Sequence, residues 1–407
     1  MQKNLSGGGK YFLPKEAAKK RRCEEVLADV FFKAGYEEVI APVVDQAETM
    51  EMDPGTAPYR VMDPTGQMLV LRPDWTTPMA HLAAVRLQQV PRPLRLCYRG
   101  SVFREEEGRR QEFYQSGLEI LGAPGDLADG EVVSLAAQCL SALGLDDFRI
   151  GLGQVKLVDG LMSTFGLAET ESKTLQDHLG RRDFVSYREA LRNMQVEETE
   201  KDLLRRLPGL HGGEDILKEL SGIPLESEAQ SAMNTLTHVY SDLEAAGLSE
   251  HIYLDLGMTR DMKYYTGIVF EGYTKGLGRP VLGGGRYDQL ARRFGADLPA
   301  TGFAVYMERL ITALERQGWD YNVSRPDYLV IPAAKRERQA VEKTDELRKR
   351  GKKVLLEVND LSYRKALEYA REKGCRYVLT EDENGWRKEK VEARKGEANA
   401  FDSFFGI

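Results

Sequence analysis

The chain has 407 residues, 57 of them basic and 64 acidic, which gives a net charge of −7 at pH 7. This length allows two or three domains and excludes a peptide or a disulfide mini-protein. With 42% hydrophobic and 30% charged residues, the composition is that of a globular chain and not of a disordered one. No run reaches the roughly 18 apolar residues of a membrane span, and the start, MQKNLSGGGKYFLPKE, lacks a signal-peptide core. We therefore expect a cytoplasmic protein.

Cysteine and histidine residues are scattered along the chain. The four cysteines, Cys23, Cys97, Cys139 and Cys375, include no C-x-x-C pair, and the five histidines form no H-E-x-x-H motif. We expect reduced and mostly buried thiols, no structural metal and no cofactor. The acidic net charge gives no overall footprint for nucleic acid, although a local basic patch is compatible with it.

The first third of the chain alternates helical and strand patterns. Residues 14–35 predict a helix, because Pro and Gly flank a stretch whose apolar residues recur on one face. A strand is predicted over 38–44, followed by a hairpin around the D-P-T-G turn of YRVMDPTGQMLVLRPD. An alanine-rich helix over 78–90 comes next. LRLCYRGSVFRE and QEFYQSGLEILG, joined by the charged connection EEEGRRQ, predict an antiparallel strand pair.

A helical insertion is predicted at about 155–248, where leucines recur at helical spacing. Strands return in HIYLDLGM, YYTGIVFEGYT and RPVLGGGR, and TGFAVYMERLITALERQG predicts a long helix. Antiparallel strands with helices indicate an α+β core, assigned to residues 1–324. Strand and helix alternation over 325–407 predicts a separate small α/β domain with a parallel or mixed sheet, and an R-P pair marks the linker.

Polar residues interrupt the apolar strand patterns. Gln115 and Glu119 are four apart on a strand, so they face the same side, where an amide and a carboxylate could bind a small polar ligand. A structural network of Glu119 with Arg104 and Arg260 is an equal alternative. The glycines of LGGGRYD could let backbone approach a ligand, with the following Arg286 and Tyr287 at the rim, or they could form a tight packing bend.

Six segments resemble, in chain order, the motifs of the class II histidyl-tRNA synthetase fold: LRPDWTTP, LCYRGSVFRE, EFYQSGLEILG, LDLGMTRDMKYYTGIVFEGY, LGGGRYDQL and TGFAVYMERL. The resemblance covers about residues 14–318 and implies an antiparallel sheet core with a helical insertion. The C-terminal segment resembles a shortened anticodon-binding domain, and its mixed charges favour a solvated surface over an RNA-binding face. Two functions compete within this superfamily, the synthetase and its inactive paralogue, the regulatory subunit of ATP phosphoribosyltransferase.

Departures from the synthetase motifs favour the paralogue. In place of R-P-E-G-T the chain has R-P-D-W-T, with Trp75 where the synthetase has glycine. The shortened motif 2 loop carries Glu105, Glu106 and Glu107, whose charges would repel a triphosphate. Tyr306 replaces the motif 3 glycine that leaves room beside the nucleotide, so its ring is expected to occupy that space. R-G-L-D-Y-Y has become R-D-M-K-Y-Y, which keeps the arginine and tyrosines.

Residues that match the synthetase's amino-acid pocket persist. By resemblance, Asp74 and Thr76 would hold the α-amino group of histidine, and Gln115 with Arg260 would lie beside its carboxylate. Glutamate and tyrosine side chains would face the imidazole, and a pocket that pairs both ring nitrogens would reject isosteres by about 10⁴ or more. The predicted histidine-binding set is Asp74, Thr76, Arg104, Gln115, Glu119, Arg260, Tyr264, Tyr265 and Tyr287, with no catalytic residue.

The resemblance therefore implies a non-catalytic regulatory subunit that activates the short catalytic subunit of ATP phosphoribosyltransferase and transmits feedback by L-histidine. A homodimer within a hetero-octamer is expected, formed through the first helix and GYEEVIAPVV, with no tRNA and no membrane as partner. The alternative is a divergent active histidyl-tRNA synthetase, in which Arg104, Arg260 and Arg309 would stabilise phosphate and carboxylate charge. An amino-acid sensor for another partner would use the same pocket.

Overall fold

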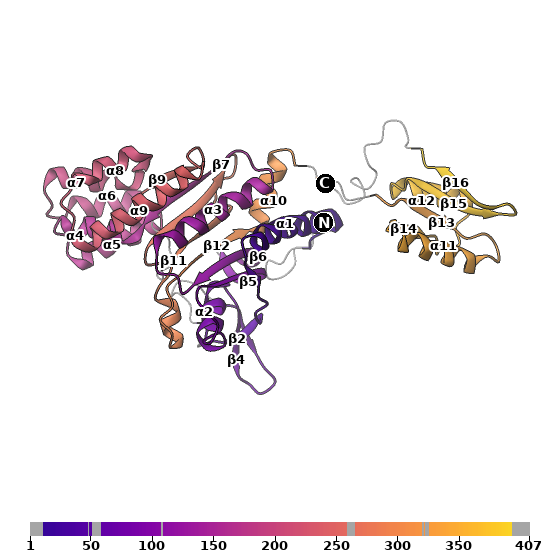
Figure 1. The fold of residues 1–407 in the computed structure, drawn as a ribbon, viewed down its shortest axis with the longest axis horizontal. Helices are drawn as coiled ribbons and strands as arrows, with labels where there is room; N and C mark the ends of the chain where they lie inside the picture. Colours follow the sequence, from indigo (N-terminus) through magenta and orange to yellow (C-terminus); the bar gives the residue numbers. More distant parts are fainter. Residues whose placement is uncertain are drawn as a thin grey trace. The chain divides into compact units, whose positions relative to one another are not determined.

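The computed structural model describes residues 11–47, 49–50, 58–106, 109–258, 265–319, 321 and 325–392. The chain divides into two compact units, Met1–Asp320 and Tyr321–Ile407 (Figure 1). The first unit contains a nine-stranded and a three-stranded sheet, and the second unit contains a four-stranded sheet. None of the helices within these described ranges is long and apolar enough to cross a membrane.

The first unit is built on a nine-stranded sheet. Its order is β1-β5-β6-β12-β11-β10-β7-β9-β8, and the strands from β5 to β7 in that order are antiparallel neighbours. Strands β1 and β9 join the two sides of this core in parallel. The α+β prediction with an antiparallel core is thus confirmed. The bounds are β1 (Glu37–Glu38), β5 (Leu94–Glu106), β6 (Arg109–Leu121), β7 (Phe148–Gln154), β8 (His211–Gly212), β9 (Ile252–Asp255), β10 (Ile268–Thr274), β11 (Leu282–Arg286) and β12 (Ala300–Tyr306).

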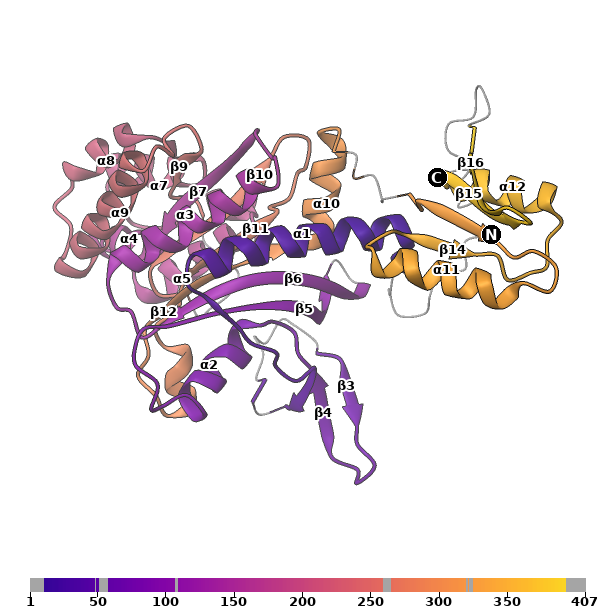
Figure 2. The ribbon, with the colours of Figure 1, turned by 45° about the vertical axis from the view of Figure 1, so that its right-hand side comes forward.

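Helices cover the two faces of this sheet differently (Figure 2). One face packs against α1 (Pro14–Lys33), α3 (Asp126–Ala142) and α10 (Met307–Arg316), and the other against α2 (Thr76–Val85) and the 3₁₀ helix η2 (Leu290–Phe294). Side chains alternate accordingly along β6: Leu118 packs with the first set of helices, while Leu121 packs with the second. Gln115 and Glu119, which alternate in step with Leu121, therefore share the α2 face.

A small sheet precedes α2 in the chain. It contains β2 (Val44–Gln46), β3 (Arg60–Met62) and β4 (Met68–Leu71), and the predicted hairpin is confirmed as β3–β4. Its turn is closed by Asp63, whose Oδ1 accepts the backbone N–H groups of Thr65 and Gln67 at 2.8 Å each. Asx turns of this kind explain why D-P-T-G predicted the hairpin.

The prediction of one strand over 38–44 is wrong. The chain leaves the large sheet after β1 and enters the small sheet only with β2, so the two short strands belong to different sheets. Pro42 lies between them and has no N–H for a strand ladder. Likewise, α2 ends at Val85, before the predicted end at residue 90, and β5 and β6 extend into the charged segment predicted as their connection.

The prediction of one long helix over 301–318 is also wrong. Its first half is strand β12, which pairs with β6 on one side and β11 on the other, and only the second half is helix α10. A short apolar run fits either structure by sequence alone. Residues 300–306 form a strand because pairing with a neighbour on each side satisfies their backbone N–H and C=O groups.

The helical region of the first unit spans α4 to α9 (Figure 1). Leucines such as Leu157, Leu161, Leu175 and Leu179 are buried in its core, as their helical spacing indicated. The elements are α4 (Val155–Thr164), α5 (Glu169–Gly180), α6 (Phe184–Arg192), α7 (Glu198–Arg206), η1 (Leu207–Gly209), α8 (Glu214–Ser221) and α9 (Ser227–Ala245), and strand β8 lies between η1 and α8.

The second unit has a four-stranded sheet of order β14-β13-β15-β16. Parallel pairing joins β13 (Tyr328–Ile331) to β14 (Val354–Leu356) and β15 (Tyr377–Asp382), while β16 (Gly385–Lys390) pairs antiparallel with β15. Helices α11 (Glu337–Lys349) and α12 (Tyr363–Glu372) contribute to its small cores. Strand β16 was not predicted, because the mostly exposed GWRKEK at a sheet edge carries no apolar pattern.

Candidate ligand-binding site

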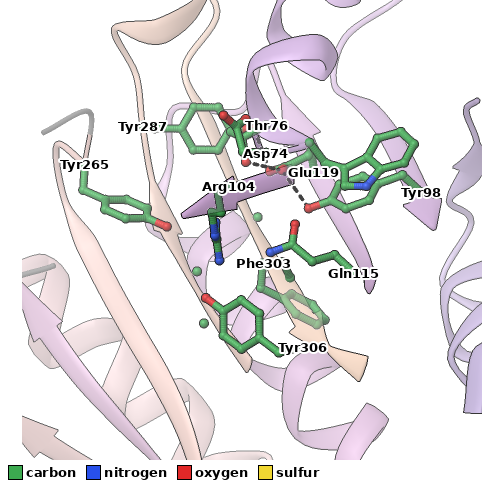
Figure 3. A pocket seen from close by; sticks show the side chains of 15 residues that line it. Asp74, Thr76, Tyr98, Arg104, Gln115, Glu119, Tyr265, Tyr287, Phe303 and Tyr306 are labelled. Carbon is green, nitrogen blue, oxygen red and sulfur yellow. Dashed lines mark hydrogen bonds between the residues drawn. The ribbon is translucent and has the colours of Figure 1, made fainter. Parts of the chain in front are cut away.

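A pocket lies on the α2 face of the large sheet (Figure 3). Seven of the nine predicted histidine-binding residues line it together, while Arg260 and Tyr264 lie outside the described residues. The full lining is Asp74, Trp75, Thr76, Tyr98, Arg104, Gln115, Glu119, Tyr265, Gly283, Gly284, Tyr287, Gly302, Phe303, Ala304 and Tyr306.

Strand register brings the lining side chains together. Gln115 and Glu119 lie on the same side of β6, as their spacing predicted, and both line the pocket. In the neighbouring β12, Tyr306 is paired with Gln115 and Gly302 with Glu119. A Cβ at Gly302 would lie 1.8 Å from Oε2 of Glu119. Only glycine therefore leaves space for the buried carboxyl group.

The glycines of β11 line the pocket and also allow close packing against β12. Gly283 and Gly284 line the pocket. A Cβ at Gly284 would also lie 2.1 Å from the carbonyl oxygen of Gly302, so close strand packing requires glycine there as well. The triple glycine thus combines a packing constraint with proximity to the pocket.

Glu119 is the buried centre of a hydroxyl network. It is 1% exposed, and its Oε2 accepts a hydrogen bond from the Tyr287 hydroxyl at 2.6 Å. Oε1 accepts from Thr76 Oγ1 at 3.1 Å and from the Tyr98 hydroxyl at 3.4 Å. Burial raises the pKa of Glu119 to about 8, and the hydroxyl bonds offset only part of this effect.

The hydrogen-bond partners of Glu119 differ from the structural network with arginines that the sequence left open. Within the described residues, the hydrogen bonds of Glu119 come from three hydroxyls and none comes from Arg104. The carboxyl group is therefore held in place by neutral donors, which leaves its charge uncompensated by an arginine ion pair in this part of the chain.

Asp74 lies beside Glu119 at the start of α2 (Figure 3). Its Oδ1 accepts the backbone N–H of Thr77 at 2.7 Å, and its Oδ2 accepts from the Thr77 hydroxyl at 3.3 Å. Burial raises the pKa of Asp74, and the charge of Arg104 acts in the opposite direction. Each carboxylate oxygen has two lone pairs, so this helix cap still leaves acceptor sites for a ligand.

Arg104 and Gln115 supply donors to the same space. Figure 3 shows both side chains directed between Glu119 and Tyr306. The Arg104 guanidinium carbon lies 5.7 Å from the ring centroid of Phe113. Carboxyl groups and a guanidinium thus line one cavity, an arrangement that suits a small molecule with both a cationic and an anionic group.

Tyr306 closes a further part of the pocket. Its ring lines the cavity, and the guanidinium carbon of Arg309 lies 4.7 Å from the ring centroid. Arg309 also donates to the carbonyl oxygen of Pro280 at 3.2 Å. The arginine that an active synthetase would direct at phosphate is thus engaged with a tyrosine ring and a main-chain carbonyl.

Tyr98 lines the pocket although it is absent from the predicted histidine-binding set. A strand period of two places its side chain on the face of β5 that also carries Arg104, and this signal could have found it. The close approach at Gly117, where a Cβ would lie 2.6 Å from the Tyr98 hydroxyl, lets the ring lie across β6. Phe303 and Gly302 were missed because their strand was predicted to be helical.

The prediction of Arg286 at the rim is wrong. Its side chain is buried on the opposite face of the sheet, where Nε donates to Asp129 Oδ2 at 2.9 Å. Nη1 and Nη2 donate to the carbonyl oxygens of Ala123 and Gly125, both at 2.9 Å. Consecutive strand residues point to opposite faces, so Tyr287 reaches the pocket while Arg286 anchors α3.

The cysteines and metal-ligating residues form no second site in the described ranges. All four cysteines are free and buried. Burial raises the pKa of the Cys375 thiol to about 11 and that of Cys97 to about 12. No group of three or more His, Cys, Asp or Glu residues suited to a metal ion occurs among the residues described.

Known proteins similar to the chain point to one family. The family model described as histidyl-tRNA synthetase matches residues 8–310. Proteins named ATP phosphoribosyltransferase regulatory subunit include one from Desulforamulus reducens, 37% identical over 95% of this chain and 97% of its own, and one from Moorella thermoacetica, 40% identical over 76% and 81%.

Solved structures share the fold. A Bacillus halodurans protein, described as an ATP phosphoribosyltransferase regulatory subunit/histidyl-tRNA synthetase, is 29% identical, with a TM-score of 0.84 over 93% of this chain and 98% of its own. Histidyl-tRNA synthetase from Nostoc sp. PCC 7120, 19% identical with a TM-score of 0.81 over 96% and 97%, supports the fold alone. The chain therefore belongs to the ATP phosphoribosyltransferase regulatory subunits, a family with the histidyl-tRNA synthetase fold.

Proposed function

We propose that this chain is the non-catalytic regulatory subunit that the short catalytic subunit of ATP phosphoribosyltransferase requires for activity, and that L-histidine binds in the pocket as a feedback effector. The single observation that carries the proposal is the pocket itself, in which Asp74, Glu119 and Arg104 meet while Tyr306 lies beside them. The relatives are named regulatory subunits of ATP phosphoribosyltransferase, which supports a catalytic subunit of that enzyme as the partner. The cellular location proposed is the cytoplasm.

The pocket chemistry supports histidine as the ligand. An α-ammonium group placed near Asp74 would be stabilised by its carboxylate, and the Thr76 oxygen retains a lone pair although its hydrogen is donated to Glu119. The α-carboxylate would be bound by Arg104 and Gln115. Charge-assisted hydrogen bonds of this kind contribute about 1.5 to 3 kcal/mol each.

The imidazole would lie toward Glu119 and Tyr265. In the empty pocket Glu119 is largely protonated near neutral pH, because its pKa is about 8. A ring N–H directed at Oε1 or Oε2 would favour the ionised carboxyl, whereas a bare ring nitrogen would accept its proton. Glu119 can therefore form a hydrogen bond with either tautomer of the imidazole ring, which a purely apolar pocket could not do.

Two features oppose the alternative of an active, divergent histidyl-tRNA synthetase. Tyr306 takes up space inside the cavity, and Arg309 lies against its ring. Three consecutive glutamates, residues 105–107, follow Arg104 in the sequence, where added negative charge disfavours a triphosphate. We propose that the chain binds neither ATP for adenylation nor tRNA.

A homodimer within a hetero-octamer is proposed by resemblance to the family. The segments expected at the dimer contact carry exposed apolar side chains in the isolated chain, namely Phe32, Ile40, Val43 and Val44. Exposed apolar groups on these segments are compatible with a protein interface.

The decisive experiment is reconstitution with the short catalytic subunit. Phosphoribosyl transfer to ATP is measured with and without this chain, and histidine is then titrated. We expect activation by the chain and inhibition by histidine, with Glu119→Gln raising the histidine concentration needed for half-inhibition. Glu228→Gln, on the exposed α9 surface, is the matched control. No activation would refute the proposal.

A second assay separates the enzyme alternative. Histidine-dependent exchange of labelled pyrophosphate into ATP requires an adenylate, so the purified and folded chain should show none. Exchange at synthetase-like rates would show that Tyr306 does not prevent nucleotide binding. If the chain binds histidine yet neither exchanges pyrophosphate nor activates the phosphoribosyltransferase, it is a sensor for another partner.

A further inference from the structure

Arg72 is a buried cation whose hydrogen bonds go to main-chain carbonyls. It is 3% exposed; its Nε donates to Ser101 at 2.7 Å, and its Nη1 donates to Ala41 at 2.8 Å and to Pro42 at 3.4 Å. No carboxylate of the described residues lies within ion-pair distance of it. Burial lowers the pKa of Arg72 to about 10. The guanidinium thus joins strand β5 to the segment between β1 and β2.

The same guanidinium begins a stack of three side chains. Its Cζ lies 3.6 Å from the centroid of the Trp75 ring, and that ring stacks on Tyr98 with centroids 4.8 Å apart and an interplanar angle of 11°. Both rings are almost fully buried. Gly100 leaves room for the stack, because a Cβ there would lie 2.8 Å from both Arg72 Nη2 and Trp75 Cζ2.

The stack ends at the pocket. The Tyr98 hydroxyl donates to Glu119 Oε1, and Thr76, which directly follows Trp75, donates to the same oxygen. One of these donors, Tyr98, stacks on the Trp75 ring, and the other belongs to the residue bonded to Trp75 in the chain, so both lie next to Trp75. Displacement of that ring would move two of the three donors of Glu119 at once.

The other end of the stack reaches the surface segment 39–43. Besides the side-chain bonds to Ala41 and Pro42, the backbone N–H of Arg72 donates to the carbonyl of Val43 at 2.9 Å. Ile40 is 89% exposed and Val43 is 42% exposed. A surface segment is thus tied to the pocket through one side chain and its stacked neighbours.

We propose that Arg72 is a positioning residue of the pocket and that, through Trp75 and Tyr98, it makes the ligand affinity depend on the conformation of segment 39–43. The ligand identity, L-histidine, rests on the proposed function, whereas the coupling between segment and pocket does not. Coupling is reciprocal, so whatever holds the segment changes affinity in the pocket, and a bound ligand changes the segment by the same factor. A continuous chain of packed and hydrogen-bonded groups is the physical basis.

A pair of proline substitutions in the full chain tests the coupling. Pro42→Gly loosens the segment without altering any pocket side chain, and Pro64→Gly, in the β3–β4 turn, loosens a different surface loop by the same chemistry. The fluorescence emission of Trp75 is measured without ligand. Because Trp319 and Trp386 also emit, the spectrum of Trp75→Phe is subtracted to obtain the contribution of Trp75. We expect Pro42→Gly to shift this emission and to weaken histidine binding, measured by calorimetry, by about tenfold. Pro64→Gly should do neither.

Arg72 variants provide the second test. Arg72→Lys keeps the charge but cannot bridge Ser101 and Ala41 while lying flat on the Trp75 ring, so it should lose affinity much as Arg72→Met does. Thermal melting confirms that each variant is folded. Identical emission and affinity for the two proline variants, or wild-type affinity in folded Arg72→Met, would overturn the inference. If wild type binds no histidine, the proposed function fails, and the emission comparison alone decides the coupling.

Discussion

The Tyr287 hydroxyl lies 2.6 Å from Oε2 of Glu119, and both side chains are almost fully buried. Tyr287 directly follows Arg286, whose ion pair with Asp129 holds the other face of the sheet. Two consecutive residues thus connect the pocket carboxyl to the N-terminal turns of α3. The position of Glu119 depends on packing on both sides of the sheet.

The stability of the ligand-free protein should fall as pH rises toward 8. The pKa of Glu119 is raised from 4.5 to about 8, so between these values the folded state binds one more proton than the unfolded state. Stability then decreases by up to about 1.4 kcal/mol per pH unit over this window and changes no further above it. Glu119→Gln should flatten the slope, as measured by urea unfolding from about pH 5 to pH 8.

The control for this experiment is Glu228→Gln. Glu228 has its pKa lowered by a hydrogen bond from Lys156 at the surface, so it contributes no change in this window. The Glu228→Gln slope should match that of the wild type. A Glu119→Gln slope equal to that of the wild type would mean that the buried carboxyl is ionised in the folded state.

Gly302→Ala should remove the pocket and destabilise the sheet. The added Cβ would lie 1.8 Å from Glu119 Oε2 and 2.4 Å from the carbonyl oxygen of Leu118, so backbone and carboxyl must both shift. Overpacking of this severity costs about 3 kcal/mol or more. Gly278→Ala, where nothing lies within 4 Å of the added Cβ, is the matched control. Equal melting temperatures for the two variants would contradict this description of the sheet.

Asp129→Asn should be strongly destabilising. Asp129 is 1% exposed and Arg286 is 6% exposed, so the substitution leaves the buried guanidinium with only Asp288, whose Oδ1 lies 3.2 Å from Nη1, as an ion-pair partner. Breaking a buried pair from one side costs about 3 to 5 kcal/mol, and the remaining pair with Asp288 places the expected loss at the lower end of this range. Asp29→Asn, which removes an exposed pair with Lys33, should leave the melting temperature close to that of the wild type. A similar result for both variants would show that the Arg286 pair is hydrated.

Thiol labelling should distinguish the unfolding of the two units. Cys23, Cys97 and Cys139 are buried in the first unit, and Cys375 is buried in the core of the second. In native buffer all four should react slowly with a disulfide reagent, because burial and raised pKa values suppress the thiolate. With increasing urea, we expect Cys375 to become reactive at a different concentration from the other three. Rapid reaction of the native protein would contradict the burial.

Local pattern was sufficient for much of this fold. The D-P-T-G turn predicted the β3–β4 hairpin because Asp63 closes it through bonds within the turn. Strand periodicity also placed Gln115 and Glu119 on one face, and the structure adds that they line the same pocket. Such predictions succeed because the interactions that decide them span only a few residues.

Predictions failed where partners distant in the sequence decide the structure. Residues 300–306 carry apolar side chains that fit a helix or a strand, and only pairing with β6 and β11 selects the strand. Strand alternation puts Arg286 and Tyr287 on opposite faces, but which of the two faces the pocket depends on partners far away in the chain, such as Asp129 for Arg286. The period of β5 puts Tyr98 on the same face as Arg104, but its contacts with Gly117 and Glu119 on the neighbouring strand follow only from the pairing of the two strands.

The position of β12 between β6 and β11 also constrains biosynthesis. Residues 300–306 complete the ladder of residues 115–121, so during translation one edge of β6 has no partner until almost the whole first unit has left the ribosome. An unpaired strand edge is prone to join other chains, and long-range pairing forms slowly. Nascent chains of this protein are therefore expected to depend on chaperones until residue 306 is exposed, and truncations that end before β12 should aggregate rather than fold.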